Sequence, residues 1–336
     1  MSRLIQFLLP RTAWILALII LGVCIALDPA FQKPAYWEVL LRQAFPAAAL
    51  ALILTPIILT GGIDLSIASV AVFSSVVIGF LWKSCGWSIG WALCGGVAAG
   101  GFAGLCNAGL VTLGVLPLVA TLATRELFRG LALTLTGRHP VSEFPEGLQS
   151  FWKSSTLGLP TPLIGLIILF SIVYVVVHHT WIGRMLFAMG DNERAARFAG
   201  VPTQKLKLGL YIASGLIAGV CGIALVMHFD VATAENSEKS LDLLAIACVV
   251  LGGARITGGQ GHVVGTCLGI VTLVALRGAA QGISSTWRET VLGAVLVFVA
   301  IIHELAARGA QANLKRREAA CSKSDLTSAQ PDNKEG

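Results

Sequence analysis

Five ionisable side chains stand inside apolar stretches of the sequence, where charged residues are least expected. They are Asp64, Arg125, Glu126, Arg129 and Asp242. A charged group is costly to place in lipid, so such residues usually face the interior of a helical bundle or a water-filled cavity. Buried carboxylates and guanidinium groups can pair with one another, contact a polar ligand or cap a helix. These five residues are therefore candidates for a functional or structural site.

A first break in the apolar pattern covers residues 60–66, Thr-Gly-Gly-Ile-Asp-Leu-Ser. Irregular backbone at membrane depth is tolerated only where it is buried in protein or lines a wet cavity. We therefore expect Gly61, Gly62, Asp64 and Ser66 to shape an internal site. Because Asp64 leads directly into a helical run, an N-cap is its favoured role, with a functional carboxylate as the alternative.

A second break holds five glycines in the ten residues 252–261: Gly252, Gly253, Gly258, Gly259 and Gly261. Such a stretch predicts a tight backbone path between two closely packed helices. It matches neither the G-x-G-x-x-G nor the G-x-x-x-x-G-K-[ST] pattern, so a nucleotide-binding loop is not expected. One glycine-rich break in each half is typical of transporters built from internal repeats, although the similarity between the halves is too faint to establish a repeat.

A polar loop at about 179–207 contains five basic residues. Within it, Asp191 or Asn192 can cap a short helix and Gly200 can end it. Closely spaced alanines on that helix suit docking into a groove of another protein, and an ordinary surface helix is an equal alternative. The candidate docking residues are Gly190, Asn192, Glu193, Arg194, Ala195, Ala196, Arg197 and Gly200.

The helix predicted near residues 116–135 carries Glu126 and Arg129 three positions apart, so the two can pair on one face. A structural ion pair near a helix end and a role in a translocation pathway are equally open for this helix.

The elements that hold these residues are apolar helices. The chain of 336 residues is 55% hydrophobic and only 12% charged, whereas a soluble domain has about 25% charged residues. A spanning helix needs about 20 mainly apolar residues. Ten candidates run about 12–27, 40–60, 66–82, 88–109, 116–135, 160–178, 208–227, 241–253, 262–280 and 287–303. The prediction is an all-α, polytopic transmembrane bundle.

Basic residues indicate the orientation of this bundle. They concentrate in the loop at 179–207 and after His303, and cytoplasmic loops carry the excess of Lys and Arg. An even number of spans separates these segments from the N-terminus, so both termini are predicted to be cytoplasmic. We expect a permease domain at 1–303 and a cytoplasmic, partly disordered tail at 304–336.

Several function classes find little support. The net charge of +6 reflects loop and tail residues, so nucleic-acid binding is not expected. The eight cysteines form no C-x-x-C pair, which argues against a zinc site or a disulfide framework. The pairs His178–His179 and His139–Glu143 are the suggestive clusters for an enzyme, and neither has good metal-ligand spacing. We expect no catalytic residue, metal or cofactor in this chain.

Four segments, in this order, resemble the ribose/xylose/arabinose-type permease family of ABC sugar importers. That family has a T-G-G-I-D-L-S-x-G-S motif, matched from Thr60, and an R-G-L-A-x-x-x-T-G-G segment, matched within 116–137. Its G-R-x-x-x-A-x-G-x-N-x-x-A-A-x-x-x-G-I loop looks like residues 183–201. Its E-L-D-x-I-A-x-V-V-x-G-G segment, with the glycines that follow, looks like residues 240–266. The chain departs from the family at Ala68, Leu118, Arg138 and Ser240.

The resemblance implies an all-helical permease of the vitamin-B12-importer type that works as a dimer in the bacterial inner membrane. The loop 183–201 would be the coupling helix that docks on a separate ABC ATPase subunit, which binds the ATP. A periplasmic or extracellular sugar-binding protein would deliver a monosaccharide similar to ribose, xylose or rhamnose, and the second permease would be a copy or a paralogue.

Two other transporters remain as alternatives. An ion-coupled secondary transporter would use Asp64, Glu126 or Asp242 as an ion site. A permease for branched-chain amino acids would share the architecture, although the motifs at 60–66 and 183–201 have the sugar-type sequence.

Overall fold

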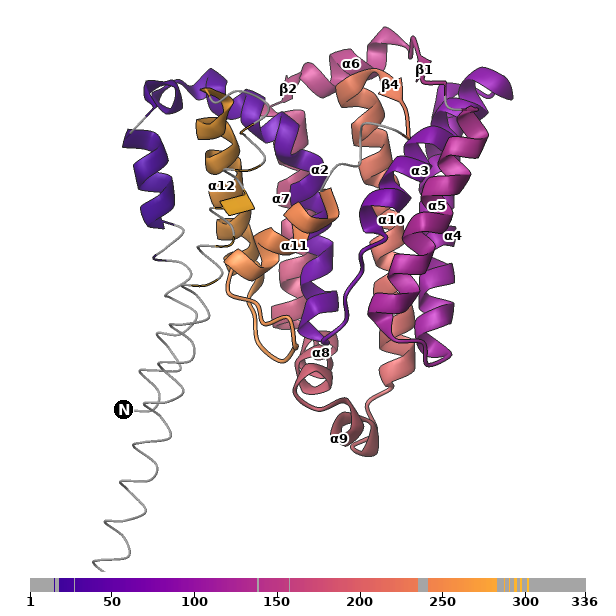
Figure 1. Ribbon diagram of the computed structural model, residues 1–336, viewed down its shortest axis with the longest axis vertical. Coiled ribbons are helices and arrows are strands. Elements are labelled where there is room, and N and C mark those ends of the chain that lie inside the picture. Colours follow the sequence, from indigo (N-terminus) through magenta and orange to yellow (C-terminus); the bar gives the residue numbers. More distant parts are fainter. Residues whose placement is uncertain are drawn as a thin grey trace, which may run out of the picture.

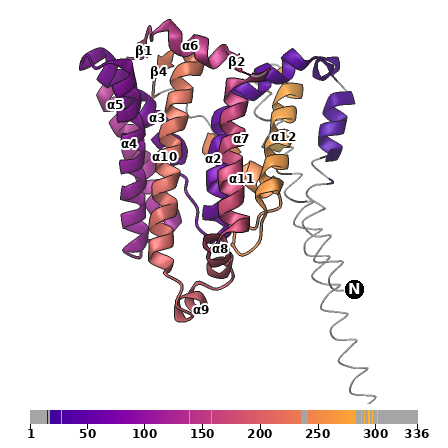
Figure 2. The same cartoon turned by 180° about the vertical axis from the view of Figure 1, so that it is seen from behind.

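The computed structural model describes a helical bundle (Figures 1 and 2). The described residues are 15, 18–26, 28–137, 139–156, 158–234 and 241–282, together with 287, 290, 293, 294, 297 and 301. The tail at 304–336 and most of the tenth predicted span lie outside this part of the chain, as do Arg138 and Ser240.

Long helices make up the bundle. They are α2 (Pro34–Leu59), α3 (Ile67–Gly79), α4 (Ile89–Thr112), α5 (Pro117–Thr136), α7 (Thr161–His179), α10 (Thr203–Phe229), α11 (Leu241–Leu251) and α12 (Val263–Ala279). One wider turn, η2 (Phe80–Ser84), extends α3. Five of these segments are long and apolar enough to cross a membrane: α2, α3 with η2, α4, α7 and α10. The predicted all-α polytopic membrane fold is thereby confirmed.

Short elements lie at the two ends of the bundle (Figure 1). One end holds α6 (Glu146–Lys153) and two antiparallel strand pairs. Strand β1 (Val141–Ser142) pairs with β4 (Val231–Ala232), and β2 (Ser155–Thr156) pairs with β3 (Leu159–Pro160). The opposite end holds α8 (Trp181–Asp191) and α9 (Glu193–Phe198). The short turns η1 (Pro29–Gln32) and η3 (Ala280–Gly282) flank α2 and α12.

The core is centred on α2, which is buried continuously from Ala44 to Leu59. A helix that is apolar on all sides belongs inside a bundle rather than at its surface. Helices α4 and α10 pack closely because small residues meet at their crossing. A methyl group on Gly100 would lie 2.4 Å from the carbonyl oxygen of Gly215.

Two predicted spans are shorter or more irregular than expected. Helix α11 has 11 residues, and at about 1.5 Å per residue it covers only about half of a hydrocarbon core. Helix α3 begins in the middle of the bundle after an extended segment (Figure 1). Helix α11 is therefore a half-length helix, and both α11 and α3 adjoin a glycine-rich break. In the region predicted as the first span, residues 18–26 are helical.

Candidate functional site

The first break, residues 60–66, follows directly from the end of α2. The chain turns at Gly61, whose φ of +75° lies in the left-handed region that glycine adopts without strain. The amide of Gly62 donates to the carbonyl of Ile57 at 3.1 Å. The break therefore runs as ordered backbone into α3.

Asp64 is the polar centre of the first break and is only 2% exposed. Its Oδ1 accepts the amide of Ser66 at 3.0 Å and the hydroxyl of Ser66 at 2.7 Å. Its Oδ2 accepts the hydroxyl of Ser214, on α10, at 2.8 Å. The N-cap position of α3 is Ser66, so the prediction that Asp64 is the N-cap was wrong. Asp64 satisfies an amide at the helix start from two residues upstream.

The network around Asp64 continues across the bundle. The side-chain amide of Asn107, on α4, donates to the Ser66 hydroxyl at 2.7 Å, and Thr124, on α5, donates to the Asn107 carbonyl oxygen. Each of these side chains is at most 3% exposed. Buried polar networks whose members are paired favour one arrangement of the helices. The first break is thus tied by side chains to α4, α5 and α10.

The second break, residues 252–262, joins α11 to α12 by a tight path. At its start, a methyl group on Gly252 would lie 2.4 Å from the carbonyl carbon of Gly265. Positive φ angles occur at Gly253, Gly258, Gly259 and Gly261. The amide of Arg255 donates to Gln260 at 2.9 Å, which closes the loop on itself. The predicted close packing of two helices around this segment is confirmed.

An ion pair holds the first turn of α11. The Nη1 of Arg125, on α5, lies 3.2 Å from the Oδ2 of Asp242, and the Asp242 side chain is fully buried. The spacing of Glu126 and Arg129 allows them to pair, and that pairing stays a prediction. Both are exposed on the outer side of α5, whereas Arg125 turns inward and finds a buried carboxylate.

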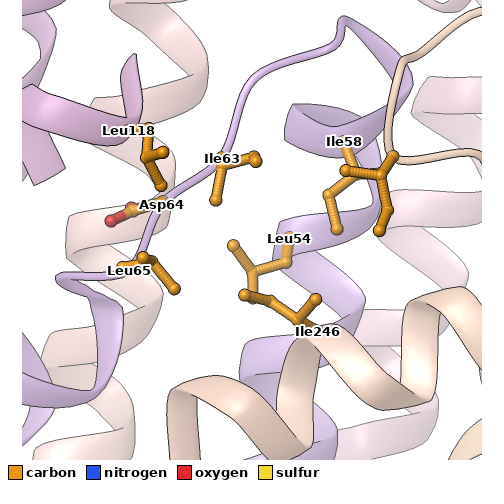
Figure 3. Close-up of a pocket in the computed structure, with 8 residues that line it drawn as sticks. Leu54, Ile58, Ile63, Asp64, Leu65, Leu118 and Ile246 are labelled. Atoms are coloured by element: carbon orange, nitrogen blue, oxygen red, sulfur yellow. The ribbon is translucent and has the colours of Figure 1, made fainter. Parts of the chain in front are cut away.

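A cavity of about 170 Å³ lies between the two breaks. Its lining comes from α2, both breaks, α5 and α11: Leu54, Ile58, Ile63, Asp64, Leu65, Leu118, Ile246 and Ile256. Figure 3 shows the apolar side chains pointing into the space, while the carboxylate of Asp64 points away from it. The cavity wall is therefore apolar, and the polar network stands behind it.

The predicted docking loop contains two helices. Asn192 caps α9 by accepting the amide of Ala195 at 3.0 Å, and Gly200 follows with a φ of +88°. These local predictions are confirmed. Helix α8 was not predicted, and it buries Gly183, Leu186 and Met189 against the bundle.

Helix α9 presents a mixed aromatic and basic surface. Phe198 is 93% exposed, and Arg194, Ala195 and Arg197 are also exposed. Ala196 is buried, so it does not belong to the exposed surface with which it was grouped. Glu193 fixes the helix, since its carboxylate lies 2.6 Å from the Lys207 ammonium of α10.

Sequence reasoning missed three residues of this site. Asn107 and Ser214 stand in apolar helices as single polar residues, a weak signal that gains meaning only when the helices are packed together. Phe198 reads as one more apolar residue until its exposure is known. Aromatic residues are enriched in protein–protein interfaces relative to the rest of the surface.

His178 and Glu143, from the two clusters considered for an enzyme, make contacts within the bundle. His178 stacks on His262 with ring centroids 3.9 Å apart, and its Nε2 accepts the amide of Val263 at 3.2 Å. Glu143 pairs with Lys83 at 3.0 Å. Among the described residues, no three His, Cys, Asp or Glu side chains lie close enough to hold a metal ion.

Comparison with known proteins matches residues 36–300 to the family described as branched-chain amino acid transport system, permease component. The chain belongs to this permease family. The ribose import permease protein RbsC of Bacillus subtilis is 35% identical over 293 residues, which cover 85% of this chain and 90% of that protein.

Two further relatives are autoinducer 2 import system permease proteins LsrD, from Yersinia enterocolitica and from Escherichia coli K12. Each is 34% identical over 260 residues, covering 75% of this chain and 78% of the relative. No solved structure matches the chain. These relatives place the permease among the ABC importer permeases of the sugar type, and it is a transport subunit.

Proposed function

We propose that the permease is the membrane-spanning subunit of an ATP-driven importer that moves a monosaccharide across the bacterial inner membrane. Similarity to a ribose permease supports the substrate class. In this proposal, the end of the bundle with α8 and α9 faces the cytoplasm. The permease itself does not bind the nucleotide. A separate ABC ATPase binds the ATP, and a sugar-binding protein delivers the substrate at the end with α6. The helices are arranged as about ten spans of the vitamin-B12-importer type.

The observation that carries this proposal is the surface of α9. Exposed Phe198 ends a short helix that also carries the exposed Arg194 and Arg197 and is held by Glu193. An exposed aromatic ring with arginines beside it is the composition of interface hot spots. We assign this surface to the ATPase, with Phe198 as the apolar anchor and with Arg194 and Arg197 as the charged contacts.

The outer side of α5 supports pairing with a second permease copy or paralogue. Glu126 is exposed on α5, a helix of 20 residues. Charged side chains at membrane depth face protein or water rather than lipid. A second permease packed beside α5 would cover this face and enclose a polar path for the sugar.

The experiment is uptake of radiolabelled monosaccharides by cells that carry the permease with its ATPase and binding protein. We expect one sugar to accumulate, and Phe198→Ala to reduce uptake and ATPase co-purification by about tenfold or more, since an anchor in an interface contributes about 2 kcal/mol. The matched control is Leu113→Ala, which truncates another apolar residue that is 83% exposed outside α9. Equal losses in both variants would contradict the assignment of α9.

An ion-coupled transporter is the second candidate, and the surroundings of its carboxylates weigh against it. Both oxygens of Asp64 accept hydroxyl groups, and Asp242 pairs with Arg125. Uptake that survives deletion of the ATPase and collapses with the membrane potential would favour this candidate.

A further inference from the structure

Three segments that are far apart in the sequence contact one another through backbone atoms at the end of α8. They are the end of α2 with Gly61, the end of α8 with Gly190, and the second break at Gly258 and Gly259. One hydrogen bond joins two of them directly, because the amide of Gly259 donates to the carbonyl of Leu59 at 2.9 Å. We call this contact the three-segment junction.

Glycine is required here by the closeness of the chains. A methyl group on Gly190 would lie 2.0 Å from the Leu59 oxygen and 2.2 Å from the Gly259 nitrogen. A methyl group on Gly258 would lie 2.6 Å from the Gly61 nitrogen and 3.1 Å from the α-carbon of Gly190. A side chain at either position would push the segments apart.

The junction connects the two functional regions already described. On one side, Gly190 is followed after one residue by Asn192, the N-cap of α9. On the other side, both breaks lead from the junction to the wall of the apolar cavity, through Ile63 in the first break and Ile256 in the second. A displacement of α9 therefore has a direct backbone route to α3 and α11, and the cavity gives the wall side chains room to move.

We propose that the three-segment junction transmits movement of the α8–α9 segment to both breaks, with Gly190 as its key positioning residue. The proposal rests on the proposed function, since it takes the ATPase as the source of the movement. It adds that Gly190, placed above among the docking candidates, acts inward on the bundle rather than on the partner. Docking and transmission are then separable by mutation.

The first test needs no partner. Hydrogen exchange is measured on the purified permease in lipid nanodiscs for wild type, Gly190→Ala and Gly209→Ala. Gly209 is a helical glycine of α10 with open space around it, so it is the matched control. We expect Gly190→Ala to accelerate amide exchange about tenfold in both breaks, and the control to stay within about twofold, because local opening is confined to the cooperative unit that is disturbed.

A change confined to α8, or to only one break, would overturn the proposal. Gly190→Ala can fail to insert, so Gly61→Ala is the second variant: its methyl group would meet the Thr257 oxygen at 3.2 Å, and its φ of +75° adds local backbone strain. It disturbs the junction from the side of α2. We expect it to accelerate exchange in the second break, and unchanged exchange there would equally count against the junction.

The second test uses the assembled importer. We expect the Gly190→Ala permease to bind the ATPase as wild type does and the assembled importer to keep ATP hydrolysis. Uptake should fall about tenfold, because coupling requires that the ATPase contact at α9 and the two breaks change conformation together. Normal uptake by a well-inserted Gly190→Ala variant would contradict the proposal. If the wild-type permease neither binds an ATPase nor imports a sugar, the proposed function fails, while the exchange experiment still decides whether the junction links α8 to the breaks.

Discussion

The two breaks have similar positions in the bundle but are held by different interactions. Residues 60–66 are fixed by side chains, since Asp64 accepts hydrogen bonds from Ser66 and Ser214. Residues 252–262 are fixed mainly by backbone packing and by the ion pair of Arg125 with Asp242 at the far end of α11. Directional hydrogen bonds define the geometry of the first break, whereas close backbone contacts at glycines hold the second. The first break is therefore most sensitive to the loss of a polar side chain, and the second to the loss of the ion pair or to an added methyl group.

The largest expected effect concerns the ion pair that anchors α11. Arg125→Met should reduce the free energy of unfolding by about 3 kcal/mol, because it leaves the buried Asp242 carboxylate without its counter-charge. Asp242→Asn should reduce it less, since Arg125 is 28% exposed and can reach other partners. Unfolding of the purified permease in detergent, followed by denaturant titration, measures both.

The double variant Arg125→Met with Asp242→Asn decides whether the pair acts as one unit. We expect it to be more stable than Arg125→Met alone, because the uncompensated charge has been removed. Additive losses would mean that the second break does not depend on this pair, and the contrast between the two breaks would lose one of its supports.

A smaller effect is expected in the network of the first break. Asp64→Ala should reduce the free energy of unfolding by about 2 kcal/mol, because it leaves the Ser66 and Ser214 hydroxyls without their acceptor. Asp64→Asn should cost about 1 kcal/mol or less, since the amide oxygen still accepts and the amide nitrogen can donate to a hydroxyl. Thermal unfolding of the three proteins under one condition gives the comparison. Equal losses for both substitutions would show that the charge, rather than the hydrogen bonds, holds this break.

The smallest expected loss of stability concerns the hydroxyl of Tyr211. Tyr211, on α10, is buried and donates to the carbonyl of Ile63 at 3.3 Å. Tyr211→Phe should cost about 1 kcal/mol, the net value of one such hydrogen bond. Tyr36→Phe is the control, because it removes a 2.9 Å hydrogen bond to the Gly278 carbonyl outside both breaks. Only the Tyr211 variant should accelerate exchange in residues 60–66, and the same change in the control would argue against a local role.

Local signals in the sequence predicted much of this arrangement. The apolar runs located the long helices, and the glycines located both breaks. Asn192 and Gly200 marked the start and end of α9 correctly, because capping depends on neighbouring residues alone. Asp64 was identified as a buried carboxylate at a helix start for the same reason.

The missed features depend on contacts between distant segments. Arg125 had a neighbour of opposite charge in Glu126, and nothing in the sequence indicated that its partner is Asp242 on α11. The glycines of the second break predicted close packing but not which chains approach them. Gly190 was assigned to the docking surface, and only the packed bundle shows it against Leu59 and Gly259. Tertiary partners of this kind follow from helix packing, which periodicity does not specify.

The apolar cavity also makes the permease sensitive to hydrostatic pressure. The cavity holds about 170 Å³ of unoccupied space, and pressure favours states with less internal void volume. If the wall side chains of the two breaks fill this space in one state of the transport cycle, that state occupies less volume than the one described here. Hydrostatic pressure would then shift the balance between the two states towards the filled one.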